Sequence, residues 1–312
     1  MAPQPRSRTL LHTILQVVPH LLWLALVALL WHQAPYGPRP MVLLALVAAI
    51  ELARIAHAVA RPHALLRTTW NDVAILLYAS LLAWHWVTGY TQRLDAMFFP
   101  PAEEIARLFF QELPAMVRGA GGSIAKLLTG FVLALILGIG SGVLLSLNER
   151  LSNATIPFAK ALGPIPPVIY IPYAICFLPN LVSAQVFVIF IGSYWPVFLS
   201  TLSGLQSVSR TQLDAARTLE LKGPELVRRV LLPGASPMIC TGALQGLIFA
   251  FILLTAAELL GSASGIGWYV KNSADFGDFQ RVLVGVAFVT ILVFAATTAT
   301  GRIEKRLLKW CE

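Results

Sequence analysis

The sequence predicts an all-α protein, a polytopic membrane helical bundle of about eight transmembrane helices with both termini in the cytoplasm. Hydrophobic residues make up 57% of its 312 residues, charged residues only 12%, and the mean hydropathy is positive. This composition lies outside the range of soluble globular domains. A helix needs roughly 20 mostly apolar residues to cross a bilayer. Runs of about that length lie at residues 11–31, 40–60, 72–89, 123–146, 154–177, 183–204, 234–260 and 281–300.

The first two runs read as a transmembrane hairpin. Arg6 and Arg8 precede the first run, as they would precede a signal peptide, but no small-x-small cleavage site follows it. We therefore expect an uncleaved anchor. The second run carries Glu51 and Arg54, which lie three residues apart on one helical face and can neutralise each other.

The fifth run contains more prolines than a straight helix tolerates. Proline removes a backbone donor, and such broken backbone persists at membrane depth only inside protein or along a wet cavity. The run therefore predicts either a broken helix beside a translocation path or a structural hinge. Tyr170, Tyr173 and Tyr194 either line such a path or fill the core. The prolines are Pro157, Pro164, Pro166, Pro167 and Pro172.

Glu258 is the one carboxylate that we find inside a strongly apolar run, near the outer end of residues 234–260. An ionisable group in a bilayer is costly unless it faces a partner or water, so Glu258 is a candidate functional residue. Residues 261–267, which include Gly265, are glycine-rich. We expect them to form an irregular outer turn near a gate.

Basic residues set the predicted orientation, because Lys and Arg concentrate in the cytoplasmic loops of membrane proteins. With eight spans, the basic residues of the N-terminus, the second loop, residues 209–233 and the C-terminal tail all fall on one side. Residues 32–38 and 178–182, on the other side, contain almost none. Topology therefore explains most of the net charge of +8, and no nucleic-acid partner is expected.

Residues 209–233 are a charged segment between apolar runs and carry the strongest functional signal. Ser209 followed by Gln212 is a capping-box pattern, which predicts the start of a helix. Gly223 can close this helix in a left-handed conformation, and Pro224 can open a second one. Two short helices joined by a tight turn are therefore expected.

Pro233 is expected to stop the second of these helices. In the first, Ala215 and Ala216 keep one side thin, which would let the helix sit in a groove of another protein. Asp214 and Arg217 are spaced to pair with each other or with that partner. The alternative is an amphipathic connector that lies on the membrane surface.

The loop and four flanking segments resemble the permeases of bacterial ABC importers. The loop pattern is D-A-A from Asp214, followed by V-x-L-P that ends at Pro233. In these permeases an acidic residue and two alanines open the helix that docks on the ATPase. The flanking segments narrow the resemblance to the importers of nitrate, sulfonate, taurine and bicarbonate. They are FFPPAEEI at 98–105, GPIPPVIYIP at 163–172, GSYWPVFLSTLSGLQSV at 192–208 and AAELLGSASGIGWYV at 256–270, within a similar stretch of about residues 95–310.

This resemblance implies an importer with a defined set of partners. Residues 63–312 would form the transmembrane domain, a core of five to six helices with a coupling loop at 205–233, and residues 1–62 an accessory hairpin. The partners would be two ABC ATPase subunits, a second copy of this chain and an extracytoplasmic substrate-binding protein. ATP and Mg would bind the ATPase, with no cofactor in this chain. The implied solute is an oxyanion or organosulfonate, moved by alternating access across a bacterial inner membrane.

The motifs and the resemblance together assign two groups of site residues. The ATPase-coupling group comprises Ser209, Gln212, Asp214, Ala215, Ala216, Arg217, Glu220, Gly223, Pro224 and Pro233. The group for the translocation pathway or gate comprises Pro164, Pro166, Pro167, Tyr170, Pro172, Tyr194, Glu258 and Gly265.

The chain departs from the family pattern at two places. Glu220 stands where these permeases usually have glycine, four residues after the second alanine. Gly223 would then close the first coupling helix about a turn later. FLPN at 177–180 replaces the usual aromatic-Phe-Gly pattern.

The sequence contains no recognisable catalytic or metal-binding motif. It has no P-loop, so we expect no ATP hydrolysis by this chain and no enzymatic activity. Its six histidines form no ligand pair, its three cysteines are isolated, and no metal site is expected. An ion-coupled secondary transporter is the alternative, although such folds usually carry internal repeats and several buried ionisable residues.

Overall fold

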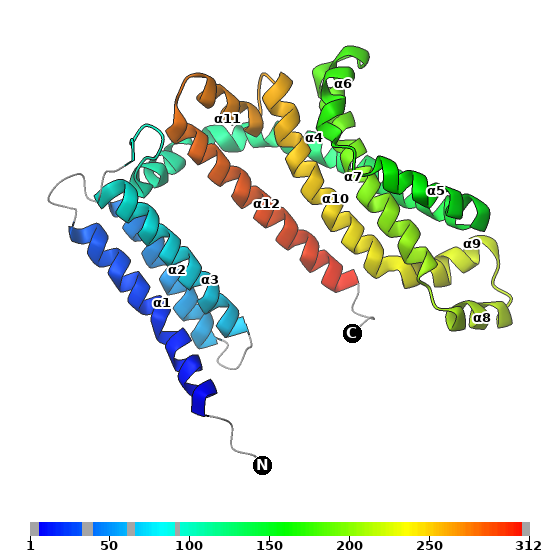
Figure 1. The fold of residues 1–312 in the computed structure, drawn as a ribbon, viewed down its shortest axis with the longest axis horizontal. Coiled ribbons are helices and arrows are strands. Elements are labelled where there is room, and N and C mark those ends of the chain that lie inside the picture. Colours follow the sequence, from blue (N-terminus) through cyan, green and yellow to red (C-terminus); the bar gives the residue numbers. More distant parts are fainter. Residues whose placement is uncertain (1–5, 33–39, 61–65, 91–93, 308–312) are drawn as a thin grey trace. The chain divides into compact units, whose positions relative to one another are not determined.

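The computed structural model describes residues 6–32, 40–60, 66–90 and 94–307, and every regular element within them is a helix (Figure 1). Its side chains are described over 17–31, 40–56, 71–89, 94–148, 150–260 and 262–306. The elements are α1 Arg6–His32, α2 Met41–Ala60, α3 Leu66–His85, the π-helical turn η1 Trp86–Tyr90, α4 Ala102–Ser146, α5 Glu149–Leu162, the 3-10 turn η2 Pro167–Tyr170 and α6 Ile171–Phe177. They continue as α7 Leu181–Gln206, α8 Arg210–Thr218, α9 Gly223–Leu226, the π-helical turn η3 Val227–Leu231, α10 Leu232–Gly261, α11 Ile266–Asp275 and α12 Phe279–Leu307. The predicted all-α class is confirmed.

The chain divides into two compact units. Unit 1 comprises Met1–Leu113 and Ser273–Val284, and unit 2 comprises Pro114–Asn272 and Gly285–Glu312. Helices α4, α11 and α12 each contribute to both units. In unit 1, α3 packs with α1 and α2 around a shared core, so the compact unit extends beyond the first two helices. The buried residues of this core are Leu26, Leu30, Leu43, Val47, Ala74, Tyr78 and Ala102.

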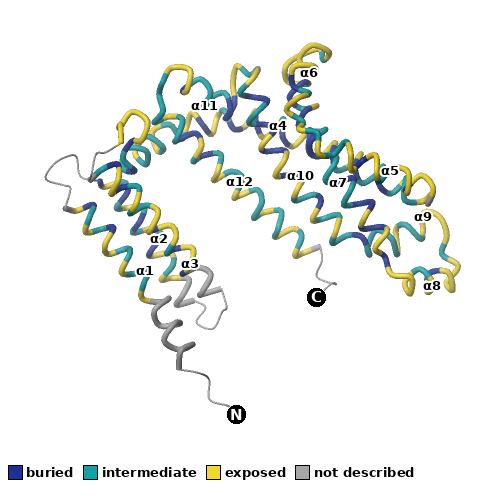
Figure 2. Tube along the Cα trace, viewed as in Figure 1, coloured by how far each residue is buried: buried dark blue, intermediate teal, exposed yellow. Residues whose placement is uncertain are grey.

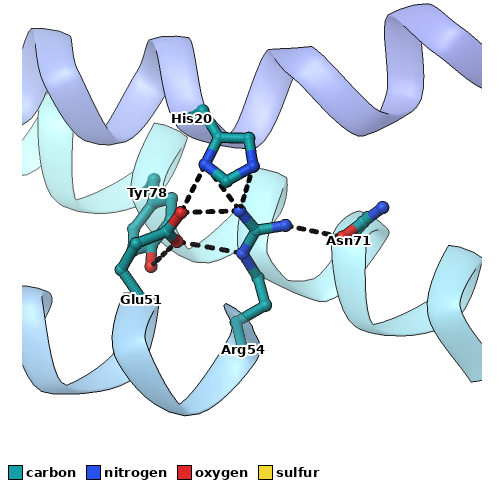
Figure 3. Close-up of polar contacts among 5 residues, drawn as sticks. All are labelled: His20, Glu51, Arg54, Asn71 and Tyr78. Carbon is teal, nitrogen blue, oxygen red and sulfur yellow. Dashed lines mark hydrogen bonds and ion pairs between the residues drawn. The ribbon is translucent and has the colours of Figure 1, made fainter. Parts of the chain in front are cut away.

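A polar cluster that is buried except at His20, whose side chain is 46% exposed, lies within the three-helix core of unit 1 (Figure 3). Arg54 donates from Nη2 and Nε to the two carboxylate oxygens of Glu51, at 2.6 and 2.9 Å. The Tyr78 hydroxyl donates to the same carboxylate at 2.9 Å, and His20 Nδ1 lies 2.6 Å from it. Arg54 also donates to Asn71 Oδ1 at 2.7 Å. The predicted pairing of Glu51 with Arg54 is confirmed, and this cluster joins α1, α2 and α3.

Helices α7 and α10 form the centre of unit 2, where glycines bring the two backbones close together. Ser193 Oγ of α7 donates to the Gly246 carbonyl of α10 at 2.9 Å. A Cβ added at Gly246 would lie 3.1 Å from the Ser193 carbonyl oxygen. Small residues allow such close approach between membrane helices. Val188 and Leu253 are almost fully buried in the surrounding core.

Five helical segments of the described residues are long and apolar enough to cross a membrane, and a bent pair of helices makes six if it counts as one span. The five are Asn71–Gly89, Ala102–Ser146, Leu181–Gln206, Gly223–Leu260 and Phe279–Arg306, while Val17–Trp31 is a shorter apolar helix. A multi-pass membrane protein is therefore confirmed. The count of eight spans stays a prediction.

The predicted fourth span, residues 123–146, lies in the second half of α4, a longer helix that begins at Ala102 and has 45 residues. A search for apolar runs detects only the second half of α4, because the first half carries charged side chains such as Glu112 and Arg118. Glu103 and Glu104 in its first turn favour a helix N-terminus at this point.

The predicted break in the fifth span is confirmed. Helix α5 ends at Leu162, and the chain resumes as η2 at Pro167. The segments Arg150–Leu162 and Pro167–Phe177 are bent by 82° relative to each other.

Candidate functional site

Helix α8 begins with the predicted cap. The Ser209 side chain accepts the Gln212 backbone N–H at 3.3 Å. Asp214 and Arg217 form the predicted ion pair, with 2.9 Å between Oδ1 and Nη1, and both side chains are exposed. An exposed pair of this kind contributes only about 0.2–1 kcal/mol. Both charges are therefore available to a partner.

The two alanines of α8 lie on different faces. Ala216 is 2% exposed and packs inward, whereas Ala215 is exposed. Leu219, one turn after Ala215, is 72% exposed. Residues four apart lie on one side of a helix, so Ala215 and Leu219 form a single apolar strip that we name the docking face. Figure 2 shows most of α8 in yellow, the colour of exposed residues.

The predicted extension of the first helix to Gly223 is wrong, because α8 ends at Thr218. Glu220 has a φ of +56°, in the left-handed region. Its N–H donates to the Arg217 carbonyl at 2.9 Å, and the Leu221 N–H donates to the Ala216 carbonyl at 3.0 Å. These two bonds make a Schellman motif, whose left-handed position is usually glycine. Helix α8 therefore ends at the position where the family usually has glycine. Glu220 adopts the left-handed conformation there, which is energetically unfavourable for a residue with a side chain.

Replacing Glu220 with Gly should therefore stabilise the loop. A left-handed conformation costs a non-glycine residue roughly 1–2 kcal/mol, part of which glycine loses again as backbone entropy. We expect a gain of about 0.5–1 kcal/mol, measured as a higher unfolding midpoint of the purified chain. Gly223→Ala is the matched control, because Gly223 also has a φ of +56° and open space around its Cβ position. A lower midpoint for Glu220→Gly would contradict the motif.

Pro233 does not end the second helix, contrary to the prediction. A continuous helix runs through α9, η3 and α10, from Gly223 to Leu260. The Leu232 N–H donates to the carbonyl of Val227, five residues earlier. This π-helical turn directly before Pro233 accommodates a residue that lacks an N–H and crowds the preceding turn. The loop is therefore joined to α10 without a break.

Glu258 lies near the other end of α10 and is fully buried. Lys126 Nζ of α4 is 2.5 Å from Glu258 Oε1, and Ser123 Oγ donates to the same oxygen at 2.7 Å. The Gly267 N–H of α11 donates to Oε2 at 2.8 Å. Lys126 also donates to Gln185 Oε1 of α7 at 2.9 Å. One carboxylate thus joins α4, α10 and α11, and its cation reaches α7.

The predicted irregular turn follows α10 directly. We name residues 262–265 the α10–α11 turn. Gly265 has a φ of +121°, and a Cβ there would overlap the Glu258 carboxylate. The Ile266 N–H donates to Ser123 Oγ at 3.0 Å. Glycine at 265 is therefore required both by the backbone and by the carboxylate behind it.

The other predicted pathway residues lie in different surroundings. The Tyr194 hydroxyl lies 3.0 Å from Ser141 Oγ, and its ring stacks on Phe198 with 5.5 Å between centroids. Pro167 lies against Gly192 of α7. These contacts place Tyr194 and Pro167 in the packing of α7, whereas Gly265 contacts Glu258. Pro164, Pro166 and Pro172 are exposed, and Tyr170 is half-buried.

Sequence analysis missed Lys126, Ser123 and Gln185. The available signal was Lys126 itself, a basic residue within the apolar run at 123–146. The link from this region to Glu258 could not be read from spacing, because 135 residues separate Ser123 from Glu258. In the part of the chain that the structure describes, no group of three or more His, Cys, Asp or Glu residues could hold a metal ion.

Comparison with known proteins gives a consistent set of similarities. Residues 134–309 match the family model described as binding-protein-dependent transport system inner membrane component. The chain is 26% identical to the taurine transport system permease protein TauC of Escherichia coli (strain K12), over 74% of this chain and 87% of TauC. It is 27% identical to the nitrate import permease protein NrtB of Leptolyngbya laminosa, over 60% and 67%. An inward-facing structure of the MetNI methionine ABC transporter shares the fold, with a TM-score of 0.52 and 20% identity over 62% of this chain and 95% of that chain.

Proposed function

This chain belongs to the binding-protein-dependent transport system inner membrane components, as an ABC importer permease of the nitrate, sulfonate and taurine group. We propose that it is the membrane-spanning subunit of an ATP-driven importer. It spans a bacterial inner membrane with both termini in the cytoplasm. Two ABC ATPase subunits bind on the cytoplasmic side and hold ATP and Mg. A second copy of the chain completes the translocation path, and a substrate-binding protein delivers the solute. The chain itself catalyses no reaction.

The observation that carries this proposal is the unbroken helix from Gly223 to Leu260, together with the capped helix α8 that precedes it. An ATPase that contacts the docking face, Ala215 and Leu219, moves the loop when it closes on ATP. Since η3 replaces the expected stop at Pro233, that movement passes directly into a transmembrane helix. The coupling free energy comes from the difference between the loop's contacts with the two ATPase states.

At the other end of α10, the α10–α11 turn and Glu258 form part of the gate. The broken span of α5, η2 and α6 lies beside the path, because irregular backbone at membrane depth needs protein or water around it. The solute is a small oxyanion or organosulfonate, in line with the nitrate and taurine permeases that the chain resembles.

The alternative is an ion-coupled secondary transporter, and uptake into proteoliposomes separates the two. The complete complex is reconstituted with its binding protein, and uptake of labelled nitrate and taurine is followed with internal ATP or with an imposed ion gradient. We expect uptake only with ATP, unchanged when ionophores dissipate all gradients. Uptake driven by a gradient in the absence of ATP would instead establish the ion-coupled transporter.

A further inference from the structure

We propose that Lys126 is a positioning residue that holds the α10–α11 turn closed through Glu258. This inference rests on the proposed function, which assigns the turn to the gate. Lys126 and Ser123 precede residues 134–309, the part of the chain that matches the family model. Their role therefore follows from the contacts of this chain.

The Glu258 carboxylate lies in a buried site that needs a counter-ion. Glu258 is 0% exposed, and the Lys126 side chain is 11% exposed. A carboxylate buried at this depth is tolerated when a cation and hydrogen-bond donors surround it. Lys126 supplies that cation at 2.5 Å, while Gln185 accepts a further N–H and fixes the direction of the ammonium group.

The first two backbone N–H groups of α11 find their acceptors in the same site. The Gly267 N–H donates directly to Glu258 Oε2. The Ile266 N–H donates to Ser123 Oγ, whose own proton goes to Glu258 Oε1. Two consecutive backbone donors of α11 thus depend on one carboxylate, directly or through Ser123. Both face the buried side of the turn, so neither has water as a substitute while the turn is closed.

The backbone of Gly265 and Gly267 leaves no room for a side chain next to Glu258. A Cβ at Gly265 would overlap the Glu258 carboxylate, and a Cβ at Gly267 would lie 2.7 Å from Glu258 Cβ. The turn therefore lies directly against this side chain. When the carboxylate moves, the turn has to move with it.

Loss of Lys126 should consequently open the turn. Without its cation the carboxylate gains free energy by reaching water, and it then leaves the Gly267 N–H and Ser123 Oγ. Lys126→Met combined with Glu258→Gln removes both charges and keeps an acceptor oxygen for these donors. This double variant should close the turn again. The swapped pair, Lys126→Glu with Glu258→Lys, restores attraction between α4 and α10 but leaves no acceptor on residue 258, so the turn stays open.

The test measures alkylation of a buried thiol in the full-length chain in native membranes, after replacement of Cys176, Cys240 and Cys311 with serine. The reporter is Ile266→Cys, since Ile266 directly follows the turn as the first residue of α11 and is 5% exposed. The control is Leu202→Cys in α7, where the side chain is 1% exposed. We expect Lys126→Met to raise the alkylation rate of the reporter by at least about tenfold and to leave the control unchanged. The double neutral variant should return the reporter to its original rate, and the swapped pair should not.

Three results would overturn the proposal: an unchanged reporter rate in Lys126→Met, an equal rise at reporter and control, or a reporter rate restored by the swapped pair. The second result would mean that Lys126 only stabilises the chain as a whole. The measurement needs no ATPase, binding protein or solute. Uptake that proves independent of ATP would therefore sink the proposed importer and leave the alkylation result standing.

Discussion

Ala215→Trp is expected to abolish ATP-driven import while the chain still folds in the membrane. Ala215 is exposed on α8, so the chain itself has room for the indole. A packed partner does not, and forcing extra volume into a packed contact costs about 1–3 kcal/mol. ATPase affinity should therefore fall about tenfold or more, with import falling at least as far. Uptake and ATPase activity are measured on the same reconstituted complex.

Two further variants make this prediction specific to the docking face. Arg210→Trp places the same indole at an exposed position on another side of α8, although it adds less volume and removes a positive charge, and it should retain import. Ala216→Trp should fail to accumulate, because Ala216 is 2% exposed and packs inside the loop. Full import by Ala215→Trp would show that this face meets no partner.

Glu258→Gln is expected to produce the largest loss of stability. The change leaves the Lys126 ammonium without its carboxylate in a site where the lysine side chain is 11% exposed. Removing one partner of a buried ion pair typically costs about 3–5 kcal/mol, whereas replacing both partners can be nearly neutral. The unfolding midpoint of the purified chain should fall sharply in Glu258→Gln and recover in the double variant with Lys126→Met.

Import should also fall in Glu258→Gln, because the start of α11 loses its charged acceptor. Thr241→Val is a suitable control, since Thr241 is an exposed residue of the same helix whose hydroxyl bonds only its own helix at the Pro237 carbonyl. Wild-type stability together with wild-type uptake in Glu258→Gln would remove this residue from the candidate site.

Features that depend on local chemistry were predictable from the sequence. The Ser209 cap, the Asp214–Arg217 pair and the Glu51–Arg54 pair all involve residues three positions apart, where helix geometry alone brings side chains together. The break in the fifth span was also predictable, because each proline removes a backbone donor and crowds the preceding turn locally.

Other features depend on tertiary context. The first half of α4 escaped a search for apolar runs because it carries charged side chains such as Glu112 and Arg118. Glu220 adopts a backbone conformation that its residue type disfavours, since two backbone hydrogen bonds close α8 there. Pro233 reads as a helix stop, but a π-helical turn accommodates it. Lys126 finds its partner on a helix far along the chain, which spacing cannot reveal.

The central claim is that this chain binds an ABC ATPase through α8. A quantitative pull-down from native membranes tests this claim most directly. The tagged full-length chain is purified in mild detergent, as wild type, as Arg210→Trp, and as a variant with both Asp214→Lys and Ala215→Trp. We predict that an ABC ATPase is recovered in equal amount with the wild type and Arg210→Trp, and is lost from the double variant although the chain itself is present. Recovery of the chain without an ATPase, together with uptake driven by an ion gradient, would contradict the account.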